Sequence, residues 1–158
     1  MKRKLSILLT IAPLIIIGDQ ITKLWVEAII SPLRPIQVVE NFFHVTLVRN
    51  TGGAFGILSG FGSSQVQNVF VLVTIAAVVF IGFLYFKLSP EQSWPSIGIA
   101  LIMGGAVGNL IDRIRLGAVI DFIDLHFYSH HWPAFNVADS AITIGAFIVG
   151  TCTVLKKC

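Results

Sequence analysis

Two aspartates in the C-terminal third of the chain have the residue type and placement for chemistry. Asp139 lies about one helical turn inside the last apolar segment, and Asp121 precedes the loop that leads to it. A carboxylate at the mouth of a membrane segment is costly to bury, so it marks a candidate functional site. Two carboxylates in contact do not both ionise easily, so a pair can share one proton and activate a water molecule. We predict that Asp121 and Asp139 form such a pair in an intramembrane protease.

Asp124 competes with Asp121 for this role because it lies only three residues further along the chain. In an extended segment the two side chains face opposite sides, and Asp124 then points away from Asp139. In a helical segment they share a face, and either could meet Asp139. Which member of the pair first acts as the base also stays open, because coupled carboxylates titrate as a unit.

Further polar side chains lie near the ends of apolar segments. Asp19 and Lys23 are four residues apart, so they can pair on one helix face and lower each other's cost of burial. The other candidates are Asn109, Asp112 and Arg113 at the end of one apolar segment, and Asn136 at the start of another. The alternative is that these groups only join helices to one another.

Other chemistries have weaker support. A zinc site is suggested by three histidines in the loop between the aspartates, namely His126, His130 and His131. A His-Glu-x-x-His motif is absent from the sequence, and neighbouring aromatic residues favour an interfacial belt. Ser140 lacks the Gly-x-Ser-x-Gly setting of a serine nucleophile. We therefore predict no metal and no other cofactor.

The composition indicates the bilayer as solvent. Hydrophobic residues make up 55% of the 158 residues and charged residues only 12%, whereas soluble domains average about 25% charged residues. The net charge is only +3, and the sequence shows no basic face typical of nucleic-acid binding, so no nucleic-acid partner is expected. The two cysteines, Cys152 and Cys158, indicate neither a disulfide framework nor a zinc site.

Four apolar segments are long enough to span a membrane. They predict helices at about residues 5–29, 66–86, 96–114 and 135–155. The first has the basic start of a signal peptide, but no small-x-small cleavage site follows, so a spanning helix is favoured. Gly104 and Gly108 have the small-xxx-small spacing that permits close helix contact.

The segment at about residues 36–58 has a different pattern. Apolar and polar residues alternate from Phe43 to Val48, and Asn50-Thr51-Gly52-Gly53 predicts a turn. We expect a short extracytoplasmic β-sheet that lies on the membrane. The predicted fold is thus an all-α membrane protein with a small β addition, in which residues 1–158 form a single integral membrane domain.

Charge predicts the orientation. Four spans place both termini on one side, and that side carries most of the basic residues: Lys2, Arg3, Lys4, Lys87, Lys156 and Lys157. By the positive-inside rule this side is the cytoplasm. The polar ends of the first, third and fourth helices then lie at one depth, facing outward. A transporter or proton-conducting protein needs polar groups across the whole thickness, so it is a weaker alternative, as is a purely structural subunit.

Five motifs resemble those of the lipoprotein signal peptidase family, also called signal peptidase II, in the family's order. They are Asp-Gln-Ile-Thr-Lys at 19–23, Asn-Thr-Gly-Gly-Ala-Phe at 50–55, Gly-Gly-Ala-Val-Gly-Asn-Leu-Ile-Asp-Arg at 104–113, Val-Ile-Asp-Phe at 119–122, and Phe-Asn-Val-Ala-Asp-Ser-Ala-Ile at 135–142. The resemblance implies a bacterial cytoplasmic (inner) membrane aspartic endopeptidase. Such an enzyme removes signal peptides from prolipoproteins N-terminal to a diacylglyceryl-modified cysteine.

The resemblance also implies roles for individual residues. Asp121 and Asp139 would be the catalytic pair. The residues that would shape the site and hold substrate are Asp19, Lys23, Asn50, Gly52, Asn109, Asp112, Arg113, Asn136 and Ala138. The implied partners are prolipoproteins, membrane lipid and the cyclic peptide antibiotic globomycin.

Overall fold

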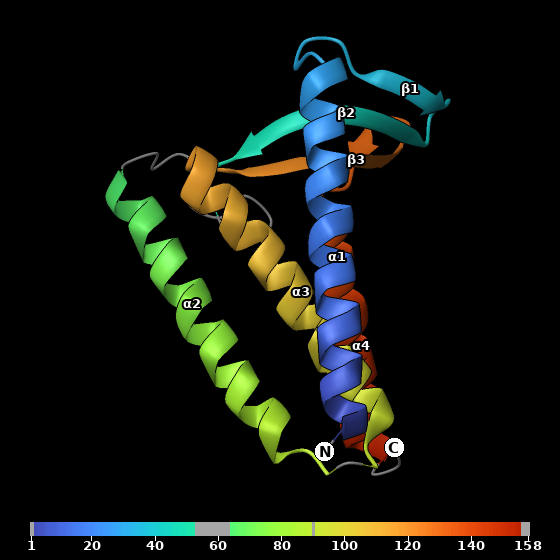
Figure 1. The fold of residues 1–158 in the computed structure, drawn as a ribbon. Coiled ribbons are helices and arrows are strands. Elements are labelled where there is room, and N and C mark those ends of the chain that lie inside the picture. The colour runs from blue at the N-terminus through green and yellow to red at the C-terminus, as the bar shows by residue number, and fades with distance from the viewer. Residues whose placement is uncertain (1, 53–63, 90, 156–158) are drawn as a thin grey trace.

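The computed structural model describes residues 2–52, 64–89 and 91–155. Its helices are α1 (Lys2–Ile29), α2 (Ser64–Lys87), α3 (Ser93–Leu116) and α4 (Val137–Leu155), and its strands are β1 (Ile36–Val39), β2 (Phe43–Asn50), β3 (Val119–Phe127) and β4 (His130–His131). All four helices are long and apolar enough to cross a membrane. The small sheet lies at one end of the helix bundle, and the two chain ends lie at the other (Figure 1).

The predicted fold class, four membrane helices with a small β addition, is confirmed. Two details differ from the prediction. Helix α4 begins at Val137 and not at residue 135, because Asn136 forms its N-cap. The sheet also extends beyond the predicted β segment, since it includes β3, which contains Asp121, and β4 from the loop that follows. Residues 53–58 of the predicted β segment lie outside the described residues.

Helix α3 packs against the other three helices, and glycines allow the close approach. A Cβ atom added at Gly104 would come within 3.0 Å of the Ala12 carbonyl oxygen of α1, so the predicted contact at this glycine is present. One added at Gly108 would lie 2.7 Å from Asp19 Oδ2, also on α1. These glycines therefore set the spacing between the two helices that carry most of the buried charge.

The sheet is antiparallel, with the strand order β1-β2-β3-β4. Its core is formed by Val26 of α1, Ile30 just after this helix, and three residues of the sheet, Leu47, Ile120 and Phe122. In the β2–β3 pair, Val48 faces Asp121 across the strands and Asn50 faces Val119. The sheet thus packs on the last turns of α1 and brings β3 to the end of α3.

At the opposite end of the bundle, hydrogen bonds that the sequence did not predict join the start of α1 to the end of α2. Lys4 is buried, and its Nζ donates to the carbonyls of Tyr85 at 3.2 Å, Phe86 at 3.4 Å and Leu88 at 2.5 Å. The Tyr85 hydroxyl donates back to the Lys4 carbonyl at 2.5 Å. Lys4 therefore satisfies the last carbonyls of α2 and joins that helix to α1.

Cys152, for which no disulfide was expected, is disulfide-bonded.

Candidate active site

Asp121 lies on β3 with its side chain turned into the bundle, and only 3% of it is exposed. Asn136 Nδ2 donates to its Oδ1 at 2.7 Å, and Asn50 Nδ2 donates to its Oδ2 at 3.0 Å. Burial and the nearby charge of Asp139 raise the pKa of Asp121 to about 7, although the two amide hydrogen bonds and Lys23 act in the other direction. This carboxyl group can therefore hold a proton near neutral pH.

Asp139 lies in the first turn of α4 and is only partly buried. The N-cap residue Asn136 accepts a hydrogen bond from the Asp139 backbone N–H at 2.9 Å, and Asp139 Oδ2 accepts one from the Asn136 N–H at 3.3 Å. This reciprocal pattern is a capping box. Asn109 Nδ2 donates to the other carboxylate oxygen at 2.8 Å. The helix start thus fixes the orientation of the Asp139 carboxylate.

Asn136 connects the two aspartates. Its amide nitrogen donates to Asp121 on β3, while its backbone N–H and side-chain oxygen bind Asp139 on α4. The same amide nitrogen lies 3.1 Å from the Ile120 carbonyl and 3.2 Å from Asn109 Oδ1. Asn136 is fully buried, and this one side chain contacts both carboxylates and so sets their relative position.

A buried ionic cluster lies beneath the pair. Lys23 Nζ is 2.8 Å from Asp19 Oδ2, 2.7 Å from Asp112 Oδ2 and 2.9 Å from Asn109 Oδ1. Neither carboxylate is more than 2% exposed. The predicted pairing of Asp19 with Lys23 is therefore present in the structure, and Asp112 is a second partner.

This ionic cluster also holds the backbone of the site. Asp19 Oδ1 accepts the Ala138 N–H at 2.9 Å, and Asp112 Oδ2 accepts the Ile120 N–H at 3.2 Å. Ala138 and Ile120 are the residues that immediately precede Asp139 and Asp121. Each carboxylate of the cluster thus anchors the chain next to one member of the pair.

Gln20 belongs to this network and was not predicted as a site residue. Its amide nitrogen donates to Asp112 Oδ1 at 2.9 Å and lies 3.3 Å from Asp19 Oδ2. Its side-chain oxygen accepts a hydrogen bond from Arg115 at 3.2 Å. The signal that could have identified it is its place within the Asp19–Lys23 motif.

Asn50, Gly52 and Arg113 form a second group next to Asp121, which Asn50 contacts directly. The Asn50 side-chain oxygen accepts the Gly52 N–H at 2.9 Å, and Arg113 Nη2 donates to the Gly52 carbonyl at 3.4 Å. The guanidinium of Arg113 lies 5.4 Å from the centre of the Phe70 ring on α2. Arg113 therefore contacts the backbone just after β2 and an aromatic ring of α2.

The other candidates for chemistry lie elsewhere. Asp124 faces the opposite side of β3 and contacts His131 and His44. No group of three or more His, Cys, Asp or Glu side chains among the described residues is placed to hold a metal ion. The Ser140 hydroxyl donates to the Asn136 carbonyl at 2.9 Å, as serines within helices often do.

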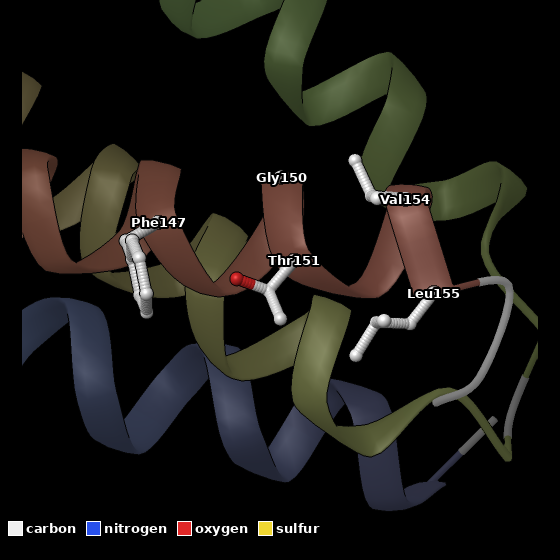
Figure 2. Close-up of a pocket in the computed structure, with 5 residues that line it drawn as sticks. All are labelled: Phe147, Gly150, Thr151, Val154 and Leu155. Atoms are coloured by element: carbon white, nitrogen blue, oxygen red, sulfur yellow. The ribbon is translucent and has the colours of Figure 1, made fainter.

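A shallow apolar pocket of about 390 Å³ lies on α4, lined by Phe147, Gly150, Thr151, Val154 and Leu155 (Figure 2). It is near the C-terminal end of this helix, whereas Asp139 is at the N-terminal end. The Thr151 hydroxyl is the only polar side-chain group among these five lining residues. This pocket has no part in the chemistry of the carboxylates.

The fold and site define a multi-pass membrane protein with two hydrogen-bonded carboxylates where a small sheet meets the bundle. The sequence matches the model of the family described as Signal peptidase (SPase) II over residues 11–155. The chain belongs to this family of membrane peptidases.

Individual relatives and solved structures agree with this assignment. The chain is 46% identical to a lipoprotein signal peptidase of Syntrophotalea carbinolica, over 88% of this chain and 85% of the relative. It is 42% identical to a lipoprotein signal peptidase of Geobacter metallireducens, over 94% of this chain and 91% of that relative. A bacterial membrane enzyme structure determined by the in meso method at 2.3 Å resolution is 32% identical, with a TM-score of 0.84 over 93% of this chain and 87% of that one.

Proposed function

We propose that this peptidase is an aspartic endopeptidase that removes signal peptides from prolipoproteins, N-terminal to a diacylglyceryl-modified cysteine. The observation that carries the proposal is that Asn136 forms hydrogen bonds with both Asp121 and Asp139 and so holds them near each other. Two carboxylates held in this way supply both the base and the acid that peptide hydrolysis needs. The names of these relatives, which are lipoprotein signal peptidases, support the substrate class.

The surroundings of the two carboxylates assign their roles. Asp139 accepts hydrogen bonds from Asn109 and the Asn136 N–H at the start of α4, where the helix dipole favours a negative charge. It is also the more exposed of the two, so it takes the proton from the attacking water. Asp121 is buried and holds a proton, which it donates to the oxygen of the scissile carbonyl. The developing oxyanion is stabilised in the same step.

The remaining site residues act by positioning. Lys23, Asp19 and Asp112 hold the backbone at Ala138 and Ile120, and Asn109 and Asn136 orient the carboxylates. The outer group of Asn50, Gly52 and Arg113 offers donors and acceptors to an extended peptide backbone.

Prolipoprotein substrates with a diacylglyceryl cysteine provide the test of the proposal. The purified protein in detergent should release the signal peptide from a lipidated precursor peptide, and a globomycin-type cyclic peptide should block the release. Burial of the lipid chains contributes about 0.8 kcal/mol per CH₂ group. We therefore expect the unmodified precursor to be cleaved at least tenfold more slowly. Equal cleavage of both precursors would exclude a lipid-selective site, and no cleavage of either would exclude the proposed activity.

The pH dependence of the activity follows from the proposed roles. The active form has Asp139 ionised and Asp121 protonated. Since the pKa of Asp121 is raised to about 7, its proton is present below this pH and lost above it. We expect kcat/KM to fall about tenfold per pH unit above roughly pH 7. A profile that is flat from pH 6 to 9 would contradict the assignment of Asp121 as the proton donor.

We also propose that residues 1–158 form one integral domain in the bacterial cytoplasmic membrane, with cytoplasmic termini and the site facing outward. The helix ends that carry Lys2, Arg3, Lys4 and Lys87, namely the start of α1 and the end of α2, lie at the end of the bundle opposite the sheet (Figure 1), which supports this orientation. An impermeant thiol reagent added to intact spheroplasts should label Tyr128→Cys on the sheet and should miss Lys2→Cys. Labelling of Lys2→Cys alone would reverse the orientation.

A further inference from the structure

Three imidazoles and one carboxylate gather on the face of the outer sheet that is turned away from Asp121. His44 on β2 lies directly across from Asp124 on β3, and His126 on β3 lies across from His131 on β4. The ring centres of His44 and His126 are 4.3 Å apart, and those of His126 and His131 are 4.6 Å apart. Side chains of three strands therefore meet in one cluster.

The hydrogen bonds in this cluster give the three rings different roles. His131 Nδ1 lies 2.8 Å from Asp124 Oδ1 and 3.1 Å from Oδ2, while His44 Nδ1 lies 3.6 Å from Oδ2. His126 Nδ1 must donate, because its partner at 3.0 Å is the Tyr128 carbonyl, which can only accept. Its Nε2 is buried and has no hydrogen-bond partner among the described residues.

A proton added to this nitrogen of His126 would be a buried donor without an acceptor, which is unfavourable. The other two rings differ, because a proton on either one faces the Asp124 carboxylate. Among the described residues, His44 from β2 and His131 from β4 are the titratable side chains within 4.0 Å of that carboxylate. His126 therefore lies between the two rings that face this carboxylate.

The cluster is connected to the active site through the loop that joins the two aspartates. Ile123 and Phe135 close the base of this loop, with the Ile123 N–H donating to the Phe135 carbonyl at 2.8 Å and the reverse bond at 3.1 Å. The contact between Asp124 and His131 joins the two sides of the loop again, next to the pairing of Ile123 with Phe135. Phe135 is followed by Asn136, which holds both carboxylates. Loosening at His131 would therefore free the part of the loop before Phe135, whose own hydrogen bonds to Ile123 hold the start of α4.

We propose that Asp124, His131 and His44 form a proton-dependent latch that fastens the β3–β4 hairpin and so positions the loop between the catalytic aspartates. With neutral imidazoles the latch consists of hydrogen bonds only. Protonated imidazoles add an attraction to the carboxylate of Asp124. Raising the pH removes protons from imidazoles and leaves only the neutral hydrogen bonds to the carboxylate, so the latch weakens as the pH rises.

Hydrogen exchange of the full-length protein in detergent tests the latch, read by mass spectrometry over residues 125–134. This segment includes the Trp132 N–H, which donates to the Leu125 carbonyl at 2.8 Å. After correction for the intrinsic rates, we expect about fivefold more protection at pH 5.5 than at pH 7.5, as for a partly exposed ion pair. Asp124→Asn and, separately, His131→Gln should abolish this difference. This readout does not depend on peptidase activity.

His130→Gln is the matched control, because His130 is exposed, lies on the same strand and is outside the cluster. It should keep the wild-type dependence on pH. Equal protection of the wild type at both pH values would overturn the proposal, as would a dependence that survives in both Asp124→Asn and His131→Gln. Protection that instead rises with pH and disappears with a chelator would also overturn it, because neutral imidazoles would then be binding a metal.

Discussion

Replacing either aspartate of the pair by asparagine is expected to lower kcat by at least about a thousandfold. Asp121→Asn and Asp139→Asn keep the shape of the side chain but remove the ionisable oxygen, and general acid–base groups contribute about 10²–10⁴-fold each. The measurement is release of the signal peptide from a lipidated precursor. If the pair acts as one unit, the double variant should lose little more than either single variant.

Loss of activity has to be separated from loss of the fold. Asp121 accepts hydrogen bonds from two amide groups, so the side-chain amide introduced by Asp121→Asn would place a donor against one of them. We expect a cost of about 1–3 kcal/mol for such an unsatisfied buried contact. The thermal unfolding midpoint in detergent should therefore fall modestly while the protein still accumulates. Asp139→Asn should behave similarly, since its carboxylate accepts from Asn109 and from a backbone N–H.

Asp124→Asn is the matched control for the same substitution on the same strand. Asp124 faces His131 and His44 on the other side of β3, so its replacement should change activity by less than about tenfold. A metal chelator should leave the wild type unaffected. Full activity in Asp121→Asn with loss in Asp124→Asn would show that the wrong carboxylate has been assigned. Loss on chelation that zinc restores would move the chemistry to the histidines.

The choice between Asp121 and Asp124 shows which part of the site could be predicted from the sequence and which part could not. Alternation along a strand puts residues three apart on opposite faces, and this favoured Asp121 if the segment were extended. The extended state itself depends on pairing with β2, about 75 residues earlier in the chain. Local residue patterns do not contain this pairing, so the sequence alone left the helical alternative open. The same long-range pairing explains why β3 and β4 were missed.

Hydropathy predicted the spanning helices well because each helix must satisfy its own backbone in lipid. It did not predict the contacts between helices. Helical spacing allowed Asn109, Asp112 and Arg113 to act together, yet only the first two bind Lys23. Arg113 contacts Gly52 instead, two residues after the end of β2, and local spacing does not contain this long-range contact. Lys4 was counted as a cytoplasmic surface charge, but it is buried against the end of α2.

The second large effect is expected at Lys23, whose ammonium group forms ion pairs with two buried carboxylates, Asp19 and Asp112. Lys23→Met keeps an unbranched side chain of similar length but leaves Asp19 and Asp112 without their cation. Removing one partner from a buried ionic cluster typically costs about 3–5 kcal/mol. We expect the variant to accumulate poorly and to unfold at a clearly lower temperature in detergent. The thermal midpoint and the detergent-soluble fraction are the measurements.

Glu27→Gln is the matched control, because Glu27 is the next acidic residue on α1 and also forms an ion pair. Its partner Arg49 lies 3.3 Å away with 64% of its side chain exposed, so this pair should contribute less than about 1 kcal/mol. Equal destabilisation by both variants would mean that the burial of Lys23 is not the cause of its effect.

Neutralising the partners of Lys23 separates its charge from its packing. In a triple variant, Lys23→Met combined with Asp19→Asn and Asp112→Asn, no buried charge is left unpaired. Both asparagine oxygens can still accept the backbone N–H groups of Ala138 and Ile120, which lie next to Asp139 and Asp121. Replacing a complete buried ionic group by neutral side chains is often close to neutral in stability. The thermal midpoint should therefore recover most of what Lys23→Met loses. A triple variant as unstable as the single one would show that the packing of Lys23, and not its charge, supports the site.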